Sequence, residues 1–326
     1  MTKNRVGEES PLVSVVIPTY DRPEYLKRAV RSVIEQTYPS IELLVIDDGS
    51  PTPAAETVNT IDTDGISQVN CIRHDGNRGA NAARNTGIRR ATGRFIAFLD
   101  DDDQWLPGKV SRQVRRFQEG PSELGVVTVG SRIVDENGNQ IGSVCPSIEG
   151  DVLEALFRGE VVGTFSLLMV RSRIISKAGL PDERLPSWQD REWNLRLAQH
   201  CKFSSIDEIL VERQVGGDSR ISDDFEEKRD ISYPRLLNTH RPIASQLGYL
   251  TERRFLGSLT RTLAFSGLSN GYYRESIKYL LRSLAYYPLD PKTYFYLCLA
   301  IGGPITFEPA RRVKQKLVGS ESRDLS

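Results

Sequence analysis

The chain has 326 residues, and its 43 basic residues balance its 43 acidic ones, so its formal net charge at pH 7 is zero. This balance excludes binding to nucleic acid or to an anionic membrane through a charge of the whole protein, and leaves only local charged patches. A chain of this length buries a sizeable core, as one large domain or as one domain with an appendage.

The start of the chain and its cysteines predict a cytoplasmic protein. The first 20 residues are polar apart from Leu12–Ile17, a run too short for a signal peptide. Cys71, Cys145, Cys201 and Cys298 lie far apart, which favours reduced thiols over disulfides or a zinc site. No apolar stretch reaches the ~18 to 20 residues of a membrane span. We therefore expect a soluble protein, or one held at the cytoplasmic face of a membrane by its surface alone.

The first half of the chain predicts strands that alternate with helices. Val13–Tyr20 is a nearly continuous β-branched run, typical of a strand buried on both faces. Pro23–Gln36 has apolar residues at helical spacing and a proline in the first turn. The elements expected next are strands at Ile41–Ser50 and Gln68–Arg73, a helix at Asn81–Ala91, and a strand at Arg94–Asp103.

This alternation predicts a parallel sheet with right-handed crossovers, in which ligands bind at the carboxyl ends of the strands. Three polar clusters lie at such ends: TYDR (19–22), DDGS (47–50) and DDDD (100–103). We expect the three strand ends to converge on one crevice.

Beyond Trp105 the pattern changes. Around a polar turn we expect two separate strands, and from about Asp223 onward only helices. The apolar piece Tyr294–Ile301 suits a core better than a membrane contact. The predicted domains are residues 1–220 and a helical extension at 221–326. The other expected elements are a helix at Lys109–Gln118, strands at Gly125–Val129 and Ser131–Val134, a strand that enters a helix within 163–175, and a helix at Trp188–Cys201.

The acidic run Asp100–Asp103 suits a hard divalent cation, which prefers a few carboxylate oxygens together with substrate phosphates. Strand alternation would place Asp100 and Asp102 on one side, if the extended geometry persists that far. A solvated acidic turn, or an N-cap for the next helix, explains the run equally well. Asp48 has the same two interpretations, an ordinary turn residue or a carboxylate that binds a base or ribose.

Three segments in order resemble the motifs of family 2 inverting glycosyltransferases with the GT-A fold. They are VSVVIPTYDRPEYLKRAVRSVIEQTYPSIELLVIDDGS, NRGANAARNTGIRRATGRFIAFLDDDDQWLPGKV and PSWQDREWNLRLA, and the resemblance covers about Val13 to Arg213. The fold that it implies is α/β, a Rossmann-like mixed sheet flanked by helices, here with an all-helical C-terminal extension.

The resemblance also implies roles for individual residues. Asp102 and Asp100 would hold Mg²⁺ or Mn²⁺, with Asp102 the more direct ligand, and Asp103 would shape the turn. Tyr20 would stack on the nucleotide base, and Asp48 would contact that base. The residues implied in nucleotide binding are Pro18, Thr19, Tyr20, Asp48, Arg84, Asn85, Asp100 and Asp101.

Asp190 is the implied catalytic base. The acid that precedes it in the family is Gln189 here, and Asp190 also has an alternative role as a helix N-cap. The segment that follows lacks the family's histidine, which leaves Arg213 and Arg220 to neutralise phosphate.

The implied reaction moves a sugar, with inversion, from a nucleotide-diphosphate donor to a hydroxyl of a glycan or lipid-linked acceptor, as in polysaccharide biosynthesis or protein glycosylation. A uridine diphosphate sugar suits the motif most readily, and the helical tail would contact a membrane or a protein. Two alternatives stay open. One is a nucleotidyltransferase, whose glycine-rich loop is missing after the first strand. The other is an inactive nucleotide-sugar-binding scaffold.

Overall fold

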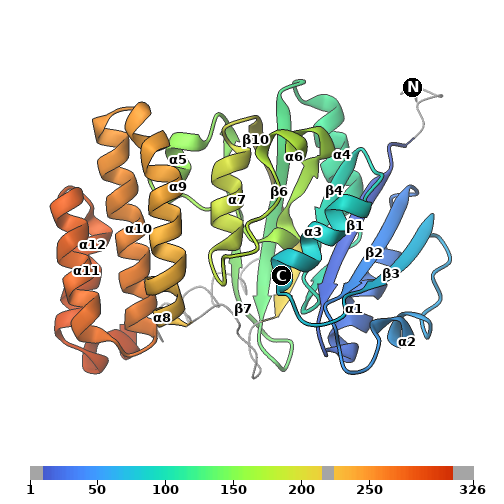
Figure 1. Ribbon diagram of the computed structural model, residues 1–326, viewed down its shortest axis with the longest axis horizontal. Coiled ribbons are helices and arrows are strands. Elements are labelled where there is room, and N and C mark those ends of the chain that lie inside the picture. Colours follow the sequence, from blue (N-terminus) through green and yellow to red (C-terminus); the bar gives the residue numbers. More distant parts are fainter. Residues whose placement is uncertain (1–9, 215–223, 311–326) are drawn as a thin grey trace.

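The computed structural model describes residues 10–214 and 224–310, which form one large sheet flanked by helices (Figure 1). The strands are β1 (Val13–Thr19), β2 (Ile41–Asp47), β3 (Gln68–Arg73), β4 (Phe95–Phe98), β5 (Asp103–Trp105), β6 (Leu124–Val134), β7 (Gln140–Val144), β8 (Glu149–Gly150), β9 (Met169–Arg171) and β10 (Lys202–Gln214).

The helices that flank the sheet, in chain order, are α1 (Pro23–Ile34), α2 (Ala54–Val58), α3 (Ala80–Arg90), α4 (Lys109–Glu119), α5 (Leu153–Phe157), the 3₁₀ turn η1 (Phe165–Leu167), α6 (Ser172–Ala178) and α7 (Gln189–Leu197). The C-terminal helices are α8 (Phe225–Glu227), the π-helical η2 (Lys228–Ser232), α9 (Tyr233–Gln246), α10 (Tyr249–Ser269), α11 (Tyr273–Tyr286) and α12 (Pro291–Ile301).

The sheet is mixed, with strand order β3-β2-β1-β4-β9-β6-β10-β5. Its first four strands are parallel, as the alternating pattern predicts. The short strand β9 runs antiparallel to β4 and to β6, and β5 runs antiparallel to β10. The mixed α/β sheet with a helical C-terminal region confirms the expected fold class.

Strand β1 shows why an unbroken apolar run forms here. All seven of its residues are buried, because helices cover both faces of the sheet. Val15 and Ile17 pack on the side of α1 and α4, whereas Val16 packs on the side of α3 and α7. On that second side α3 lies so close that a methyl group at Gly87 would be 2.3 Å from the side chain of Val16.

In the second half one strand prediction was wrong and one long strand was missed. The strands expected on either side of Gly130 are one strand, β6, because the residues between 124 and 131 are all buried. Strand β10 was not predicted. It is rich in charged residues, and its pairing with β6, β5 and β8 supplies the stability that its composition does not.

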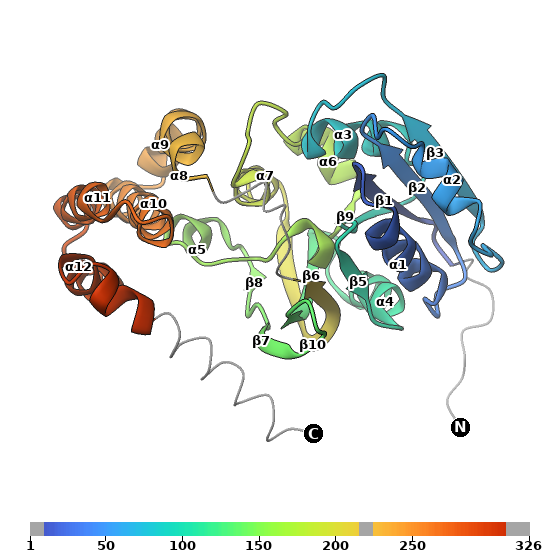
Figure 2. The ribbon, with the colours of Figure 1, turned by 90° about the horizontal axis from the view of Figure 1, so that it is seen from below.

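Beyond residue 223, all the regular elements that the structure describes are helices, as expected. In Figure 2, α9 and α10 lie beside α7 and α5, and α11 and α12 lie farther from the sheet. One hydrophobic core contains Phe98 of β4, Trp193 of α7 and Phe255 of α10. The predicted boundary at 220/221 falls outside the described residues, and this core continues from one side of it to the other.

Candidate active site at the carboxyl edge of the sheet

The ends of β1, β2 and β4 are joined by hydrogen bonds, as the three polar clusters predict. Thr19 Oγ1 donates to Asp101 Oδ2 at 2.7 Å, which links β1 to the acidic run. The backbone N–H of Asp21 donates to Ser50 Oγ at 2.9 Å, which links β1 to the loop after β2. The three strand ends therefore form one site.

The four aspartates span a turn between β4 and β5, and Asp103 is already the first residue of β5. The N–H of Asp103 donates to the carbonyl of Asp100 at 3.0 Å, so β4 does not continue through the acidic run. The side chains of Asp100 and Asp102 are 28% and 39% exposed, whereas those of Asp101 and Asp103 are each 7% exposed. The expected separation into two pairs is present, but a turn produces it.

The buried aspartates Asp101 and Asp103 stabilise the turn through contacts with arginines. Arg22 lies 3.3 Å from Asp101 and 3.2 Å from Asp102, and Arg213 lies 4.0 Å from Asp103. Burial raises the pKa of Asp101 to about 7, although Arg22 and Thr19 act against this shift. The predicted contact of Asp101 with a nucleotide stays a prediction, since both its oxygens already have partners.

Arg84 connects the acidic turn to the helix of the predicted base. One terminal nitrogen lies 2.5 Å from Asp100 Oδ1, and the other donates to Gln189 Oε1 at 3.0 Å. Its guanidinium lies 4.0 Å from the centre of the Phe165 ring, and its buried Nε has no hydrogen-bond partner among the described residues. The buried guanidinium of Arg84, which lies between Asp100 and Gln189, is suited to bind a phosphate oxygen.

The hydrogen bonds of Gln189 suggest why a glutamine stands where the family pattern has an acid. Its Nε2 donates to the carbonyl of Leu185 at 2.7 Å, while its Oε1 accepts from Arg84. A neutral amide thus orients Arg84 without neutralising it. The charge of Arg84 stays available to Asp100 and to an anionic ligand.

Asp190, the predicted base, is half-buried in the first turn of α7. Its Oδ1 accepts from the N–H of Arg191 at 2.7 Å. Burial raises its pKa, the N–H of Arg191 and the charges of Arg213 and Arg84 lower it, and the charge of Asp100 raises it. Asp190 therefore lies within electrostatic range of the acidic turn.

Trp188, directly before Gln189, has φ 58°, and Asp21 has φ 52°. Among the described residues they are the two non-glycine residues with positive φ, and both adjoin the site. Such backbone strain often marks functional loops.

Asp48 is held in place by a histidine that the sequence analysis missed. His74 Nδ1 lies 2.7 Å from Asp48 Oδ1, and His74 Nε2 lies 2.8 Å from Thr86 Oγ1 of α3. The N–H groups of Arg78 and Gly79 also donate to Asp48, at 2.7 to 3.1 Å. His74 has no motif around it, and only its distance from Asp48 in the fold reveals its role.

The other predicted nucleotide residues differ in exposure. Tyr20 is 42% exposed and able to stack on a base, whereas Pro18 is buried in β1. Asn85 Nδ2 donates to the carbonyl of Pro181 at 2.9 Å and to Glu183 at 2.8 Å, so it fixes the loop that leads to α7. Arg220 lies outside the described residues.

The exposed aspartates Asp100 and Asp102 fit a divalent cation by chemistry. Burial and the charge of Asp100 raise the pKa of Asp102, and a bound cation would relieve this repulsion. Within residues 10–214 and 224–310 the protein brings no three carboxylates, histidines or cysteines together as a metal site. Two carboxylates would suffice where water and donor phosphates complete the coordination.

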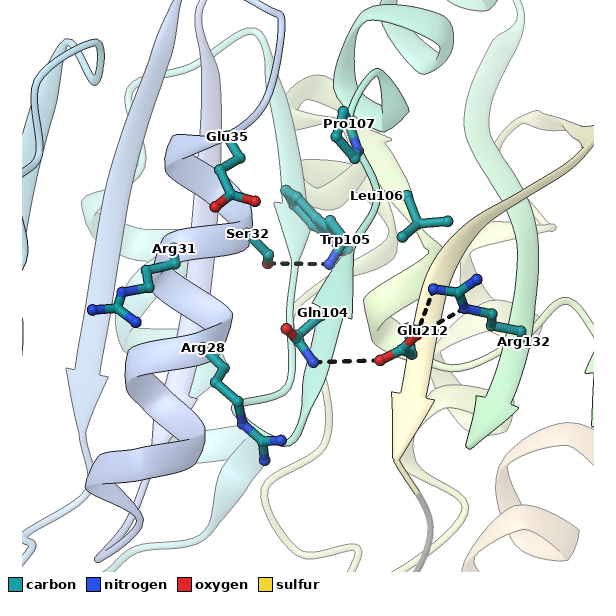
Figure 3. Close-up of a pocket in the computed structure, with 10 residues that line it drawn as sticks. All are labelled: Arg28, Arg31, Ser32, Glu35, Gln104, Trp105, Leu106, Pro107, Arg132 and Glu212. Atoms are coloured by element: carbon teal, nitrogen blue, oxygen red, sulfur yellow. Dashed lines mark hydrogen bonds and ion pairs between the residues drawn. The ribbon is translucent and has the colours of Figure 1, made fainter. Parts of the chain in front are cut away.

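A cavity of about 320 Å³ lies between α1, β5 and β10 (Figure 3). The backbone N–H of Trp105 donates to Ser32 Oγ at 3.1 Å, and the guanidinium of Arg132 lies 2.7 Å from the carboxylate of Glu212. None of the predicted site residues lines this cavity. Its contacts anchor β5, and hence the acidic turn, to α1.

Comparisons with known proteins agree with this geometry. The sequence model described as Glycosyl transferase family 2 matches residues 14–174. Residues 14–174 of the chain belong to glycosyl transferase family 2.

Two relatives show how far the similarity of this family 2 chain extends. An uncharacterized glycosyltransferase of Rickettsia felis is 29% identical over 228 residues, 67% of this chain and 37% of the relative. The GalNAc(5)-diNAcBac-PP-undecaprenol beta-1,3-glucosyltransferase of Campylobacter jejuni is 30% identical over 129 residues, 40% of each chain. The aligned region spans less than half of either relative.

Two solved structures share the fold of this family 2 chain. TarS 1-349 of S. aureus, in complex with UDP-GlcNAc, superposes with a TM-score of 0.63 at 17% identity, over 84% of this chain and 81% of TarS. The mannosyltransferase PcManGT of Pyrobaculum calidifontis, in complex with GDP-Man and Mn²⁺, has a TM-score of 0.54 at 15% identity, over 90% and 85% of the two chains.

Proposed function

We propose that this chain is an inverting, divalent-metal-dependent glycosyltransferase that moves a sugar from a nucleotide-diphosphate donor, most readily a uridine diphosphate sugar, to an acceptor hydroxyl. The observation that carries the proposal is the Arg84 bridge. It joins the acidic turn to Gln189, next to Asp190, so that the residues proposed for the cation and for the base share one edge of the sheet. Similar folds bind UDP-GlcNAc in TarS and GDP-Man with Mn²⁺ in PcManGT.

In this proposal each residue has a separate task. Tyr20 and Asp48 bind the nucleoside, and Arg84 faces the diphosphate as negative charge develops there. Asp100 and Asp102 would hold the cation, which when bound supplies Lewis-acid stabilisation of the departing diphosphate. Asp190 takes the proton of the acceptor hydroxyl, and the oxygen attacks the anomeric carbon opposite the leaving group.

A donor panel tests the proposal. The protein is incubated with UDP-, GDP- and dTDP-sugars, each with Mn²⁺, Mg²⁺ or EDTA, and released nucleoside diphosphate is measured. We expect release from one donor class that depends on metal. Release of pyrophosphate from a sugar phosphate and a nucleoside triphosphate would instead show a nucleotidyltransferase, and binding of nucleotide sugars without turnover would show a scaffold.

We further propose that the acceptor is lipid-linked and that α12 contacts the membrane around it. Among the described residues no helix has the length and apolar character to cross a bilayer. The contact in this proposal is with the membrane surface, and α12 offers exposed apolar side chains with Lys292 as its one charged residue. The exposed apolar residues on α12 and in 304–310 are Tyr294, Phe295, Cys298, Ile301 and Ile305.

Charge favours an anionic membrane over a protein partner. The neighbouring helix α11 exposes Arg274 and Lys278, and the sequence after residue 310 begins RRVKQK. Apolar side chains beside basic ones bind anionic lipid surfaces. The Campylobacter jejuni relative is named for a polyprenyl-diphosphate substrate, which supports an acceptor of this type.

Co-sedimentation with vesicles tests the membrane contact. We expect binding to phosphatidylglycerol-containing vesicles and little binding to pure phosphatidylcholine. The double substitution Phe295→Asp and Ile305→Asp should abolish it, whereas Val161→Asp, at a residue 70% exposed elsewhere on the surface, should not. Equal vesicle binding by all three proteins would overturn the assignment of α12.

A further inference from the structure

Helix α7, which carries Asp190, packs against the C-terminal helices along one side. Ser187 Oγ lies 2.9 Å from Ser232 Oγ of η2, just before α7 begins. One turn later Glu192 Oε1 lies 3.4 Å from Nε2 of the buried His240 on α9. Figure 2 shows α7 between the sheet and these helices.

Arg191 bonds in two directions from the position next to Asp190. Its backbone N–H donates to the carboxylate of Asp190 at 2.7 Å. Its guanidinium donates to Thr262 Oγ1 at 3.1 Å and to Ser258 Oγ at 3.5 Å, both on α10. In the part of the chain that the structure describes, Arg191 has no carboxylate at ion-pair distance, so these neutral hydroxyls hold it.

The two hydroxyl groups are themselves fixed. Ser258 Oγ donates to the carbonyl of Phe157 in α5 at 2.8 Å, and Thr262 Oγ1 donates to the carbonyl of Ser258 at 2.9 Å. Their hydrogens are therefore directed at carbonyl groups, and their lone pairs are available to Arg191. Loss of the guanidinium would leave both hydroxyls bonded, so the fold should survive it.

We infer that the C-terminal helices position the catalytic base of the proposed reaction, and that Arg191 is the positioning residue that joins α7 to α10. The inference rests on the proposed function. The 21-residue helix α10 shares the core of the sheet, so it offers a fixed reference for α7. A displacement of about 1 Å between reacting groups can lower a rate by up to about 10²-fold.

Arg191 also contributes a charge close to Asp190. The groups that act on Asp190 are Arg84 of α3, Arg213 of β10 and Asp100 of the acidic turn, together with Arg191 itself. Burial, with a smaller effect from the nearby charge of Arg261, lowers the pKa of Arg191 to about 10. Since this pKa is still well above 7, the guanidinium stays protonated at neutral pH. A positive charge near a carboxylate favours its ionised form, which a base requires.

The experiment compares kcat, the donor KM and the pH profile of three variants with those of the wild-type protein. Arg191→Met removes both hydrogen bonds and the charge, Arg191→Lys keeps the charge, and Thr262→Val removes an acceptor on α10. The matched control is Arg253→Met, also on α10, where the arginine donates to the carbonyls of Tyr286 and Ala285 and not to α7.

We expect Arg191→Met to lower kcat by about 10- to 100-fold at an unchanged donor KM. The acidic limb of its pH profile should move upward by about one unit, because the carboxylate of Asp190 loses a nearby cation. Arg191→Lys should restore the limb but only part of kcat. Thr262→Val should lower kcat less, and not additively with Arg191→Met. Arg253→Met should lower Tm alone.

The inference is overturned if Arg191→Met and Thr262→Val lower Tm while kcat and the acidic limb match the wild type, or if Arg253→Met lowers kcat as much as Arg191→Met. A wild-type protein without any nucleotide-sugar turnover would contradict the proposed function itself. The two failures are thus distinguishable within one experiment.

Discussion

The side of the site proposed to bind the donor (the donor side) and the side proposed to carry the base (the base side) are held in different ways. On the donor side, short loops after β1, β2 and β4 bond to one another at the edge of one parallel sheet. On the base side, α7 depends on residues that lie 45 to 71 positions later in the chain. Motifs in the first third of the chain therefore build the donor side, whereas the base side needs packing against the C-terminal helices.

The largest effect is expected on the base side. Asp190→Asn should lower transfer by ~10²- to 10⁴-fold, because an amide does not accept the proton. Affinity for the nucleoside diphosphate, measured by calorimetry, should stay within about threefold of wild type, since the donor side is separate. If affinity fell together with transfer, Asp190 would be structural, and the division into two sides would fail.

A core substitution in the C-terminal helices tests whether the helices that support the base side fold as one unit with the sheet. Phe255 is fully buried, and its ring lies 5.0 Å from that of Phe157 in α5. Phe255→Ala should lower the free energy of unfolding by about 3 to 5 kcal/mol. The control Phe295→Ala, at a residue 58% exposed, should change it by less than about 0.5 kcal/mol.

The calorimetric trace of this core variant carries a second result. A shared core predicts one unfolding transition, shifted as a whole. Two transitions, of which Phe255→Ala moves only one, would show that the helices fold independently of the sheet.

Removal of a carboxylate from the acidic turn should affect the donor side alone. Asp102→Ala should weaken the apparent Mn²⁺ affinity at least about tenfold, because one of two exposed carboxylates is lost. Nucleotide binding at several Mn²⁺ concentrations measures this effect, and Asp151→Ala, at an exposed residue, provides the control. An unchanged Mn²⁺ dependence would move the ligand to another residue of the run.

The smallest expected effect concerns the turn that orients Asp48. Gly49 has φ +83°, and an added methyl group would lie 2.6 Å from the backbone of Gly76. Gly49→Ala should destabilise the protein by about 1 to 3 kcal/mol and weaken nucleotide binding. Gly65 has φ +95° but open space around it, so Gly65→Ala isolates the cost of the dihedral. An equal loss of stability in Gly49→Ala and Gly65→Ala would show that the collision with Gly76 adds nothing to the cost of the dihedral.

The same comparison explains which features the sequence predicts. Strands β1 to β4 follow from apolar runs and the polar clusters from their position at strand ends, because these signals are local. Strand β10 and the role of His74 depend on partners far along the chain, so local patterns missed them. The separation of the four aspartates was expected for the wrong reason, since a turn replaces the strand.

The anomeric configuration of the product tests the central claim most directly. If Asp190 acts as a lone base in a single displacement, ¹H NMR of a fresh reaction mixture should show the configuration opposite to that of the donor. A product with the donor's own configuration would require a different mechanism and would contradict the account.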